Sequence, residues 1–288
     1  MDQLPLKPFS VTPYRISTIT VTGSVNSCVD LSELYDCIDI GIGALNPSLK
    51  YVEYATNKNE TNCKGQNEKK SKRKNRSTKS VTKHTKRFDN QMTLHFKKNE
   101  MTYNVKLFKN GNVQMTGVKD VQAGCQIVDD LIDLVKHYGN SNGSIVQDVT
   151  MLHNDGLRIC LMNCDFKILF NINRDVLHKV LLDDGYTCTF EPCIYQGVKL
   201  SYFMSDSATN GKCNCKVRCS GKGKKSHCTR ITIAFFQSGS VTINGAKNMS
   251  QLDLIHNFVT DTMREYSVKV QQRFYKPMKN EKKNVSIL

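Results

Sequence analysis

The sequence predicts an α+β fold made of two copies of one unit, each an antiparallel sheet with helices on one face. Two observations support this prediction. A long stretch of the chain aligns with itself, without a gap, after a shift of 128 residues. Within each copy, alternating apolar residues flank a tight-turn pair, and a segment with helical spacing follows. A sheet of this kind buries one face under its helices, so each copy is an α+β unit.

The repeated pattern reads LFKNGNVQMTGVKD in the first copy and FFQSGSVTINGAKN in the second. Agreement over about thirty ungapped positions makes chance a poor explanation. The shift places Phe108, Gly111, Val113, Gly117, Lys119, Ile127, Leu131, Val135 and Tyr138 on Phe236, Gly239, Val241, Gly245, Lys247, Ile255, Val259, Met263 and Tyr266.

The local signals agree between the copies. The Asn-Gly pair of the first and the Ser-Gly pair of the second predict a tight hairpin between two strands. The apolar residues that follow share one helical stripe, and Asp120 and Ser250 are suited to cap the two helices. The stripes are Ile127, Val128, Leu131, Leu134 and Val135, and then Leu254, Ile255, Phe258, Val259 and Met263.

Each half also begins with a strand and a short helix. The first strand is expected at residues 15–23, with a helix from Asp30. The second is expected at residues 158–170, with a helix near residues 173–182. Each half is therefore expected to run strand, helix, several antiparallel strands, helix.

These patterns divide the chain into a first repeat at residues 1–143, a second at 144–275 and a basic tail at 276–288. An insertion at about residues 57–87 interrupts the first repeat. It carries most of the formal net charge of +15 and lacks apolar periodicity, so we expect a disordered loop. A phosphate-binding arm, a nuclear import signal and a solvated loop without a partner all fit its composition.

A second insertion, at about residues 206–229, is rich in cysteine. Its four thiols lie in a segment too polar to pack a core, which suggests a knuckle held by a structural zinc ion. The spacing C-x-C-x3-C-x8-C is no standard zinc-finger pattern, so free thiols and redox pairing remain as alternatives. The candidate ligands are Cys213, Cys215, Cys219 and Cys228, with His227 adjacent to the last.

Composition excludes several classes of protein. No apolar run approaches a membrane span and the N-terminus lacks a secretory signal, so we expect an intracellular protein, in a nucleus, a viral factory or a virion. The twelve cysteines are then expected to be reduced thiols. No P-loop, dinucleotide fingerprint or nucleophile elbow is present, and we expect no catalytic activity.

Strand parity predicts which residues point away from the helices. The core set is Val105, Leu107, Val113 and Met115, and in the second copy Ile231, Ile233, Phe235, Val241 and Ile243. The outward set is Lys106, Phe108, Asn112, Gln114 and Thr116, and in the second copy Thr232, Ala234, Phe236, Ser240, Thr242 and Asn244. A small polar face with one exposed Phe in each half suits contact with a macromolecule.

Three segments carry a family resemblance. FFQSGSVTINGAK, FEPCIYQGVKLSYFM at residues 190–204 and NCDFKILF are similar to motifs of the TATA-box-binding protein family, and LFKNGNVQMTGVKD is similar more weakly. The resemblance covers about residues 12–56, 88–140 and 157–270. The long insertions resemble the divergent members encoded by large double-stranded DNA viruses.

The resemblance implies a pseudo-twofold saddle, a curved antiparallel sheet with helices on the convex face. In this family the concave face docks in the DNA minor groove, and pairs of Phe wedge between base steps. By position the wedges would be Phe108 and Phe236, with Tyr195 at a place usually held by Phe, and Phe88. The second stirrup of the family docks a TFIIB-like factor, which implicates Glu191 and Ile194.

The sequence departs from the family on its DNA-facing side. Arg15 and Ile159 stand where the family has Asn. Polar residues replace apolar ones, and we therefore expect DNA binding with an altered or weak TATA preference. The affected positions are Lys106, Gln114 and Thr242, while Thr116 is retained in one half and becomes Asn244 in the other.

The resulting hypothesis is a TATA-binding-protein-like transcription initiation factor. It would bind promoter DNA and recruit a TFIIB-like factor and RNA polymerase machinery, with no membrane partner. The alternative is a saddle that binds other proteins and has little sequence-specific affinity for DNA. A basic packaging protein would explain the charge but not the repeat.

Overall fold

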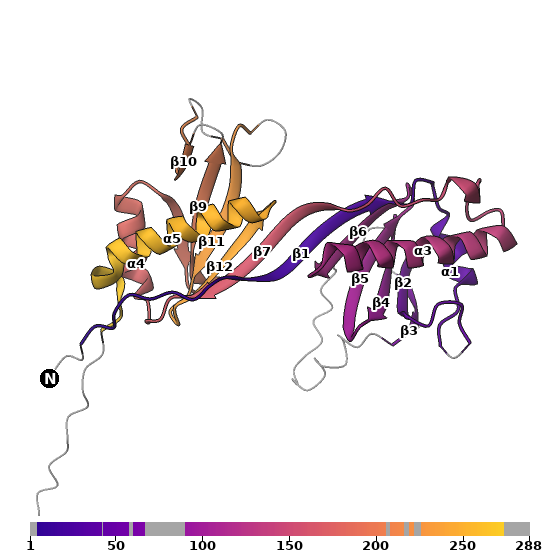
Figure 1. The fold of residues 1–288 in the computed structure, drawn as a ribbon, viewed down its shortest axis with the longest axis horizontal. Coiled ribbons are helices and arrows are strands. Elements are labelled where there is room, and N and C mark those ends of the chain that lie inside the picture. The colour runs from indigo at the N-terminus through magenta and orange to yellow at the C-terminus, as the bar shows by residue number, and fades with distance from the viewer. Residues whose placement is uncertain are drawn as a thin grey trace, which may run out of the picture. The chain divides into compact units, whose positions relative to one another are not determined.

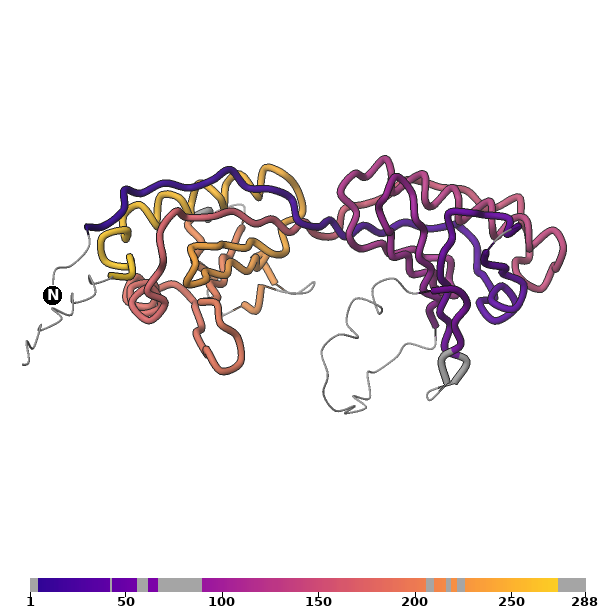
Figure 2. The backbone as a smooth tube through the Cα atoms, turned by 90° about the horizontal axis from the view of Figure 1, so that it is seen from below, coloured from indigo at the N-terminus to yellow at the C-terminus, as the bar shows by residue number. Residues whose placement is uncertain are grey.

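The fold is described from a computed structural model that covers residues 5–41, 43–57, 60–66, 90–205, 208–215, 219–221 and 226–273. The chain forms two compact units. The N-terminal unit is Ser17–Met162, and the C-terminal unit combines the segment ending at Ile16 with the chain from Asn163 onward. Figures 1 and 2 show the path of the chain through each unit. The repeat boundary at residue 143 rests on the sequence and stays a prediction.

The N-terminal unit is an antiparallel sheet with one long helix across a face (Figure 1). Its strands lie in the order β1-β6-β5-β4-β2-β3. The elements are β1 (Arg15–Ser24), α1 (Leu31–Cys37), β2 (Leu49–Asn57), β3 (Glu60–Gly65), β4 (Gln91–Lys98), β5 (Met101–Phe108), β6 (Asn112–Val118), α3 (Val121–Ser141) and η1 (Val149–Met151).

The C-terminal unit repeats this plan with another long helix over its sheet (Figure 1). The strand order is β10-β9-β11-β12-β7, and β8 also pairs with β9. The elements are β7 (Arg158–Lys167), α4 (Arg174–Asp183), β8 (Thr187–Glu191), β9 (Tyr195–Ser205), β10 (Ala208–Gly211), β11 (Thr229–Phe235), β12 (Ser240–Ala246) and α5 (Met249–Val270).

The two central hairpins have the same register, which confirms the internal repeat. Val105 faces Met115 across β5 and β6, and Ile233 faces Ile243 across β11 and β12. Adding 128 to every partner in the first hairpin reproduces the second. The turns match as well: Gly111 and Gly239 have φ of +77° and +83°, and a Cβ on either would lie 2.1 Å from a backbone oxygen. Both turns therefore require glycine.

Burial confirms the predicted core faces. All nine strand residues of the core set are at most 1% exposed, because alternate side chains of each strand face the long helix. The stripe of α3 is fully buried as expected. In α5 the stripe is centred differently: Leu252 is buried, whereas Leu254 and Phe258 are half-buried. Phe258 packs edge-on against Tyr202, with ring centroids 4.9 Å apart.

One predicted helix cap is wrong and the other is confirmed. Asp120 accepts hydrogen bonds from the first amides of α3, as expected. Helix α5 begins at Met249, and its cap is Asn248 rather than Ser250. The Asn248 side chain accepts from the amide of Gln251 at 2.9 Å, since the extended backbone of Asn248 aims its amide oxygen at the open helix end.

Part of the first insertion is ordered structure rather than loop. Residues 60–65 form β3, which pairs antiparallel with β2 at the edge of the sheet. An edge strand needs only backbone pairing with one neighbour, so its sequence shows no apolar alternation. The rest of the predicted loop, from residue 67, lies outside the described residues, as do Phe88 and the basic tail at residues 276–288.

Lys64 of this strand has a structural role within the basic insertion. Its ammonium donates to the carbonyl oxygens of Tyr35, Asp36 and Ile38 at 2.7, 3.1 and 2.9 Å. These carbonyls end helix α1, where unpaired oxygens and the helix dipole favour a cation. One positive charge of the insertion therefore stabilises the fold of the N-terminal unit.

The segment before β1 packs on the C-terminal unit. Val11 bridges to Ile168, and the amide of Lys7 donates to the side-chain oxygen of Gln271 at 2.6 Å. Tyr14 donates to Asp253 of α5 at 2.6 Å. Such pairing between residues more than 150 positions apart leaves no local pattern in the sequence. Among the described helices, none is long and apolar enough to span a membrane.

Candidate nucleic-acid interface

In the N-terminal unit, the sheet face opposite α3 carries a row of polar side chains across five strands. We call this face the open face of the unit. Cross-strand partners lie side by side on one face of a sheet, so the strand registers define the row. In order from β2 to β1 it contains Glu53, Thr93, Lys106, Gln114 and Thr22. The predicted residues Lys106 and Gln114 are therefore brought together.

The next row of this face contains a histidine that the sequence analysis missed. His95 is 5% exposed, and one of its ring nitrogens lies 3.0 Å from the side-chain nitrogen of Asn104. The Tyr51 ring lies 5.0 Å from the His95 ring, and the Tyr51 hydroxyl donates to Glu53 at 2.5 Å. Thr116 pairs with Asn104 and is exposed. This side of the face is thus a preorganised polar network.

The C-terminal unit has an equivalent open face opposite α5. The row that corresponds to Lys106 and Gln114 contains Thr189, Lys199, Ala234 and Thr242. Each unit thus has one lysine in the equivalent row. It is Lys106 on β5 in the N-terminal unit and Lys199 on β9 in the C-terminal unit. Ala234 is 1% exposed although it faces outward, because its methyl group is shorter than the flanking side chains.

Asn244 lies in the neighbouring row of the open face of the C-terminal unit. It is exposed, pairs with Thr232 across the hairpin and donates to the Thr242 hydroxyl at 3.2 Å. Lys199 was not predicted. The two-residue period that starts at Tyr195 places residue 199 on the same face and would have found it.

Two of the predicted wedge aromatics pack together in the C-terminal unit. The ring centroids of Tyr195 and Phe236 are 5.7 Å apart, with the ring planes tilted by 59°. The Lys199 ammonium lies over the Tyr195 ring, 4.0 Å from its centroid. Gly197 makes room for the pair, because a Cβ there would lie 2.8 Å from Tyr195 and 3.2 Å from Phe236.

Arg174, at the start of α4, supports the two segments that carry these rings, the start of β9 and the turn after β11. Its guanidinium donates to the backbone oxygen of Gln196 and to the side-chain oxygen of Gln237. It also lies over the Phe190 ring, 5.2 Å from the centroid. Gln196 follows Tyr195 and Gln237 follows Phe236, so one planar cation connects the start of β9 with the turn after β11. No local pattern in the sequence marks this residue.

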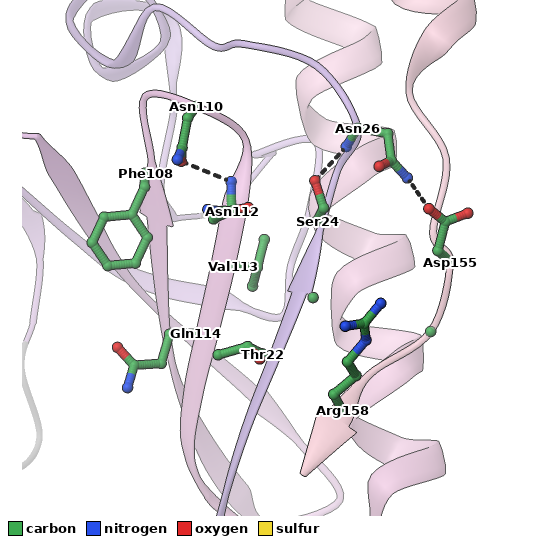
Figure 3. A pocket seen from close by; sticks show the side chains of 12 residues that line it. Thr22, Ser24, Asn26, Phe108, Asn110, Asn112, Val113, Gln114, Asp155 and Arg158 are labelled. Atoms are coloured by element: carbon green, nitrogen blue, oxygen red, sulfur yellow. Dashed lines mark hydrogen bonds between the residues drawn. The ribbon is translucent and has the colours of Figure 1, made fainter. Parts of the chain in front are cut away.

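Phe108 lies beside a hollow of about 680 Å³ in the N-terminal unit (Figure 3). Asn110 accepts from the amide of Asn112 at 3.2 Å and shapes the turn next to it. Arg158 lines the other side of the hollow and is exposed.

The C-terminal unit has a matching hollow of about 490 Å³ next to Phe236, lined also by Ser238 and Ser240. A shift of 128 residues maps Phe108, Asn110 and Asn112 onto these three residues. The hollows therefore belong to the repeat.

In the first strand of each half, the structure gives Arg15 an ion-pair partner and shows turn contacts made by Thr18 and Asn163, two residues that were not predicted. Arg15 is exposed but pairs with Asp165, with 2.8 Å between its Nε and the carboxylate. Thr18 and Asn163 take equivalent roles, accepting from the amides of Gly117 and Gly245 at 3.1 and 3.2 Å. Part of the Arg15 charge is therefore neutralised within the C-terminal unit.

The predicted partner-binding residues lie in one exposed turn. The amide of Ile194 donates to the carbonyl of Glu191 at 2.9 Å, which closes the turn between β8 and β9. The Ile194 side chain is 79% exposed. Single exposed aliphatic side chains are common on protein surfaces, so the partner-binding role of this turn stays a prediction.

The four cysteines of the second insertion are brought together. Their sulfur atoms all lie within 4.8 Å of one another. His227 is exposed and is not part of this group. Thiolates are the ligands that Zn²⁺ prefers in structural sites, and this is the group of described residues best suited to hold a metal ion.

Both the sequence and the fold are similar to those of known proteins. A protein described as TATA-box-binding protein-like from Acanthamoeba polyphaga mimivirus is 28% identical over 215 residues, spanning 68% of this chain and 51% of that relative. The TBP of Methanococcus jannaschii superposes with a TM-score of 0.50 and 16% identity, covering 88% of this chain and 99% of that one. The chain is therefore similar in sequence to a viral TATA-box-binding-protein-like protein and similar in fold to TBP. No family model matches it.

The predicted fold class is thereby confirmed. The mimivirus relative also agrees with the resemblance to members encoded by large DNA viruses. This chain spans only about half the length of the mimivirus relative. The roles of Phe108, Tyr195, Phe236 and the other interface residues stay predictions.

Proposed function

We propose that this TATA-box-binding-protein-like chain is a transcription initiation factor that binds promoter DNA through the minor groove. One observation supports it best: both units carry a half-exposed Phe beside a hollow, at positions related by the repeat and on the face without helices. A double-stranded polymer with its own pseudo-twofold symmetry is a matching ligand for two copies of one surface. The proposal includes no catalytic step.

In the proposed mechanism the aromatic side chains enter base steps. Partial unstacking costs a few kcal/mol per step and is offset by the larger surface that bent DNA contacts. Phe236 is the apolar wedge of the C-terminal unit, and Tyr195 supports it with a hydroxyl that needs a partner or water. Phe108 is the corresponding wedge of the N-terminal unit.

The polar rows determine what kind of binding follows. Lys106 and Lys199 supply one positive charge in the equivalent row of each open face, which favours contacts to phosphates and sugars over base-edge recognition. Apolar contact in the groove is reduced by Gln114 and Thr242. We therefore expect a weaker preference for A·T pairs than an apolar face would give.

Recruitment of further machinery is assigned to the exposed turn between β8 and β9. Ile194 would be the apolar anchor of a TFIIB-like factor, with Glu191 beside it as an acidic contact. The RNA polymerase machinery would then be reached through that factor.

Fluorescence anisotropy with short TATA-containing and GC-rich duplexes over a salt series tests the DNA proposal. Wild type should bind tightly at moderate salt, and the double variant Phe108→Ala/Phe236→Ala should lose at least about tenfold in affinity, the equivalent of about 1.4 kcal/mol. The matched control is Leu182→Ala/Val268→Ala, which removes exposed apolar side chains from helices α4 and α5.

A protein-interaction module is the second candidate. The carboxylate of Glu53 on the open face and the pairing of Arg15 with Asp165 both oppose DNA affinity. Binding that is weak, erased by salt and equal in wild type and the double variant would reject the minor-groove mechanism. Loss of TFIIB-like factor binding in Ile194→Asp alone would then support this candidate.

A further inference from the structure

We propose that Cys213, Cys215, Cys219 and Cys228 bind one structural Zn²⁺ ion as a four-thiolate site. The site lies in the C-terminal unit between β10 and β11, where Figure 1 shows the chain leaving the sheet. It is independent of the DNA-binding proposal, since none of the four residues lies on the open face rows.

Four of the six sulfur–sulfur distances are close to the edge of a tetrahedral site, and the remaining two pairs lie within 4.8 Å. The Sγ–Sγ distances are 3.3 Å for Cys213–Cys219, 3.6 Å for Cys215–Cys219, 3.5 Å for Cys215–Cys228 and 3.9 Å for Cys213–Cys228. A tetrahedral zinc site with Zn–S bonds of about 2.3 Å has S–S edges of about 3.8 Å. A disulfide would need about 2.05 Å, and all four cysteines are free.

The path of the chain explains why a clamp is needed here. Strands β8 and β10 both pair with the same edge of β9, β8 along its first part and β10 along its last part. Strand β11 pairs with the opposite edge of β9. The chain between β10 and β11 must therefore cross over the end of β9. The described part of this crossover forms no helix or strand.

One backbone contact anchors the crossover. The amide of Arg230 donates to the carbonyl of Gly221 at 2.9 Å, and Gly221 has φ of +65°. A Cβ at Gly221 would lie 2.5 Å from the Cβ of Arg230, so the approach depends on glycine. A polar segment with so little apolar burial gains its fixed conformation from metal binding.

The charge of the segment also suits a thiolate site. Four thiolates and one Zn²⁺ carry a net charge of −2, which neighbouring cations stabilise. Residues 212–230 contain no acid. The described basic residues of this segment are Lys212 and Arg230.

The donor set selects the kind of metal and its role. Soft sulfur ligands favour zinc over Mg²⁺ or Ca²⁺, which prefer oxygen. With four protein ligands the coordination is complete and no position is left for a substrate, as in structural zinc sites. The ion would hold β10 beside β9, where Gly211 packs against the Tyr202 ring.

Metal content by mass spectrometry of the full chain, purified under reducing conditions with zinc present, tests the site. We expect about one zinc per chain for wild type and loss of that zinc in Cys213→Ser/Cys228→Ser. The control Cys28→Ser/Cys160→Ser removes two exposed thiols outside the cluster and should retain the metal. Zinc-free wild type, iron in place of zinc, or equal loss in the control would overturn the proposal.

A second measurement uses wild type alone, so its result does not depend on whether the cysteine variant folds. Wild type is treated with a chelator and then reloaded with Co²⁺, which should give tetrahedral d–d bands and sulfur-to-cobalt charge transfer. Hydrogen exchange should accelerate reversibly at residues 208–230 after chelation and stay unchanged in β5 and β6. DNA anisotropy of the same samples separates the two proposals, because the wedge aromatics remain in place without metal. Two disulfides in the reduced preparation, or no cobalt spectrum, would refute the site.

Discussion

The rings of Tyr195 and Phe236 lie 5.7 Å apart because Gly197, two residues after Tyr195 in β9, has no side chain to separate them. The start of β9 and the turn after β11 thus present one aromatic pair on the open face of the C-terminal unit. A base step would therefore contact two rings held in one fixed arrangement, rather than two separate aromatic side chains.

Gly197→Ala should separate the two rings. The added methyl group would lie 2.8 Å from Tyr195, closer than van der Waals contact allows, so a ring must move. We expect the DNA affinity measured by anisotropy to fall about five- to tenfold, about 1 kcal/mol, with a smaller loss of thermal stability. Gly143→Ala is the control, since its added methyl group would have no atom within 4 Å, and the affinity of this variant should not change. Equal affinities for both variants would show that the pair does not touch DNA.

Arg174→Lys should loosen the start of β9 and the turn after β11, which carry the two rings. A lysine keeps the charge but cannot donate to Gln196 and Gln237 with one planar group. DNA dissociation, measured by stopped-flow fluorescence, should become faster by about threefold or more, with association little changed. Arg264→Lys, whose arginine pairs with Asp261 on the surface of α5, is the control. A purely electrostatic role for Arg174 predicts no change in the lysine variant.

Lys106→Gln and Lys199→Gln test whether the open faces contact phosphates. Each variant should reduce the slope of log affinity against log salt by about 0.9, because one fewer counterion is released on binding. The two losses should add in the double variant, since the residues lie in different units. Lys50→Gln, at an exposed position of β2, should leave the slope unchanged if contact is confined to the open faces.

Local patterns predicted the parts of the fold that depend on neighbouring residues. The hairpins at Gly111 and Gly239, the two core faces and helix α3 all follow from turn chemistry and periodicity, which act over a few residues. The boundary of α5 was displaced by two residues because both Asn248 and Ser250 can cap a helix. Choosing between them requires the packing of the helix on its sheet.

The features that could not be predicted from the sequence depend on contacts between residues far apart in the chain. The pairing of Arg174 with Gln237 and of His95 with Asn104 joins different strands and loops, and no spacing along the chain encodes it. Strand parity found Lys106 and Gln114 because each lies in a strand with clear alternation. Tyr195 and Phe236 needed the family resemblance as well, since parity gives a face but not a pair. Phe88 lies outside the described residues, so the partner of Phe108 stays a prediction.

Lys64→Met should destabilise the N-terminal unit without weakening DNA binding. Methionine keeps an apolar stem near the Tyr35 ring, but it loses the three hydrogen bonds to the end of α1 and the favourable dipole interaction. We expect the free energy of unfolding, measured by urea denaturation, to fall by about 1–2 kcal/mol. Lys50→Met, on the adjacent strand and exposed, is the matched control and should change it by less than about 0.5 kcal/mol. If Lys64 served instead as a phosphate contact of the basic insertion, the variant would reduce the salt dependence of DNA affinity and leave the urea midpoint where it is.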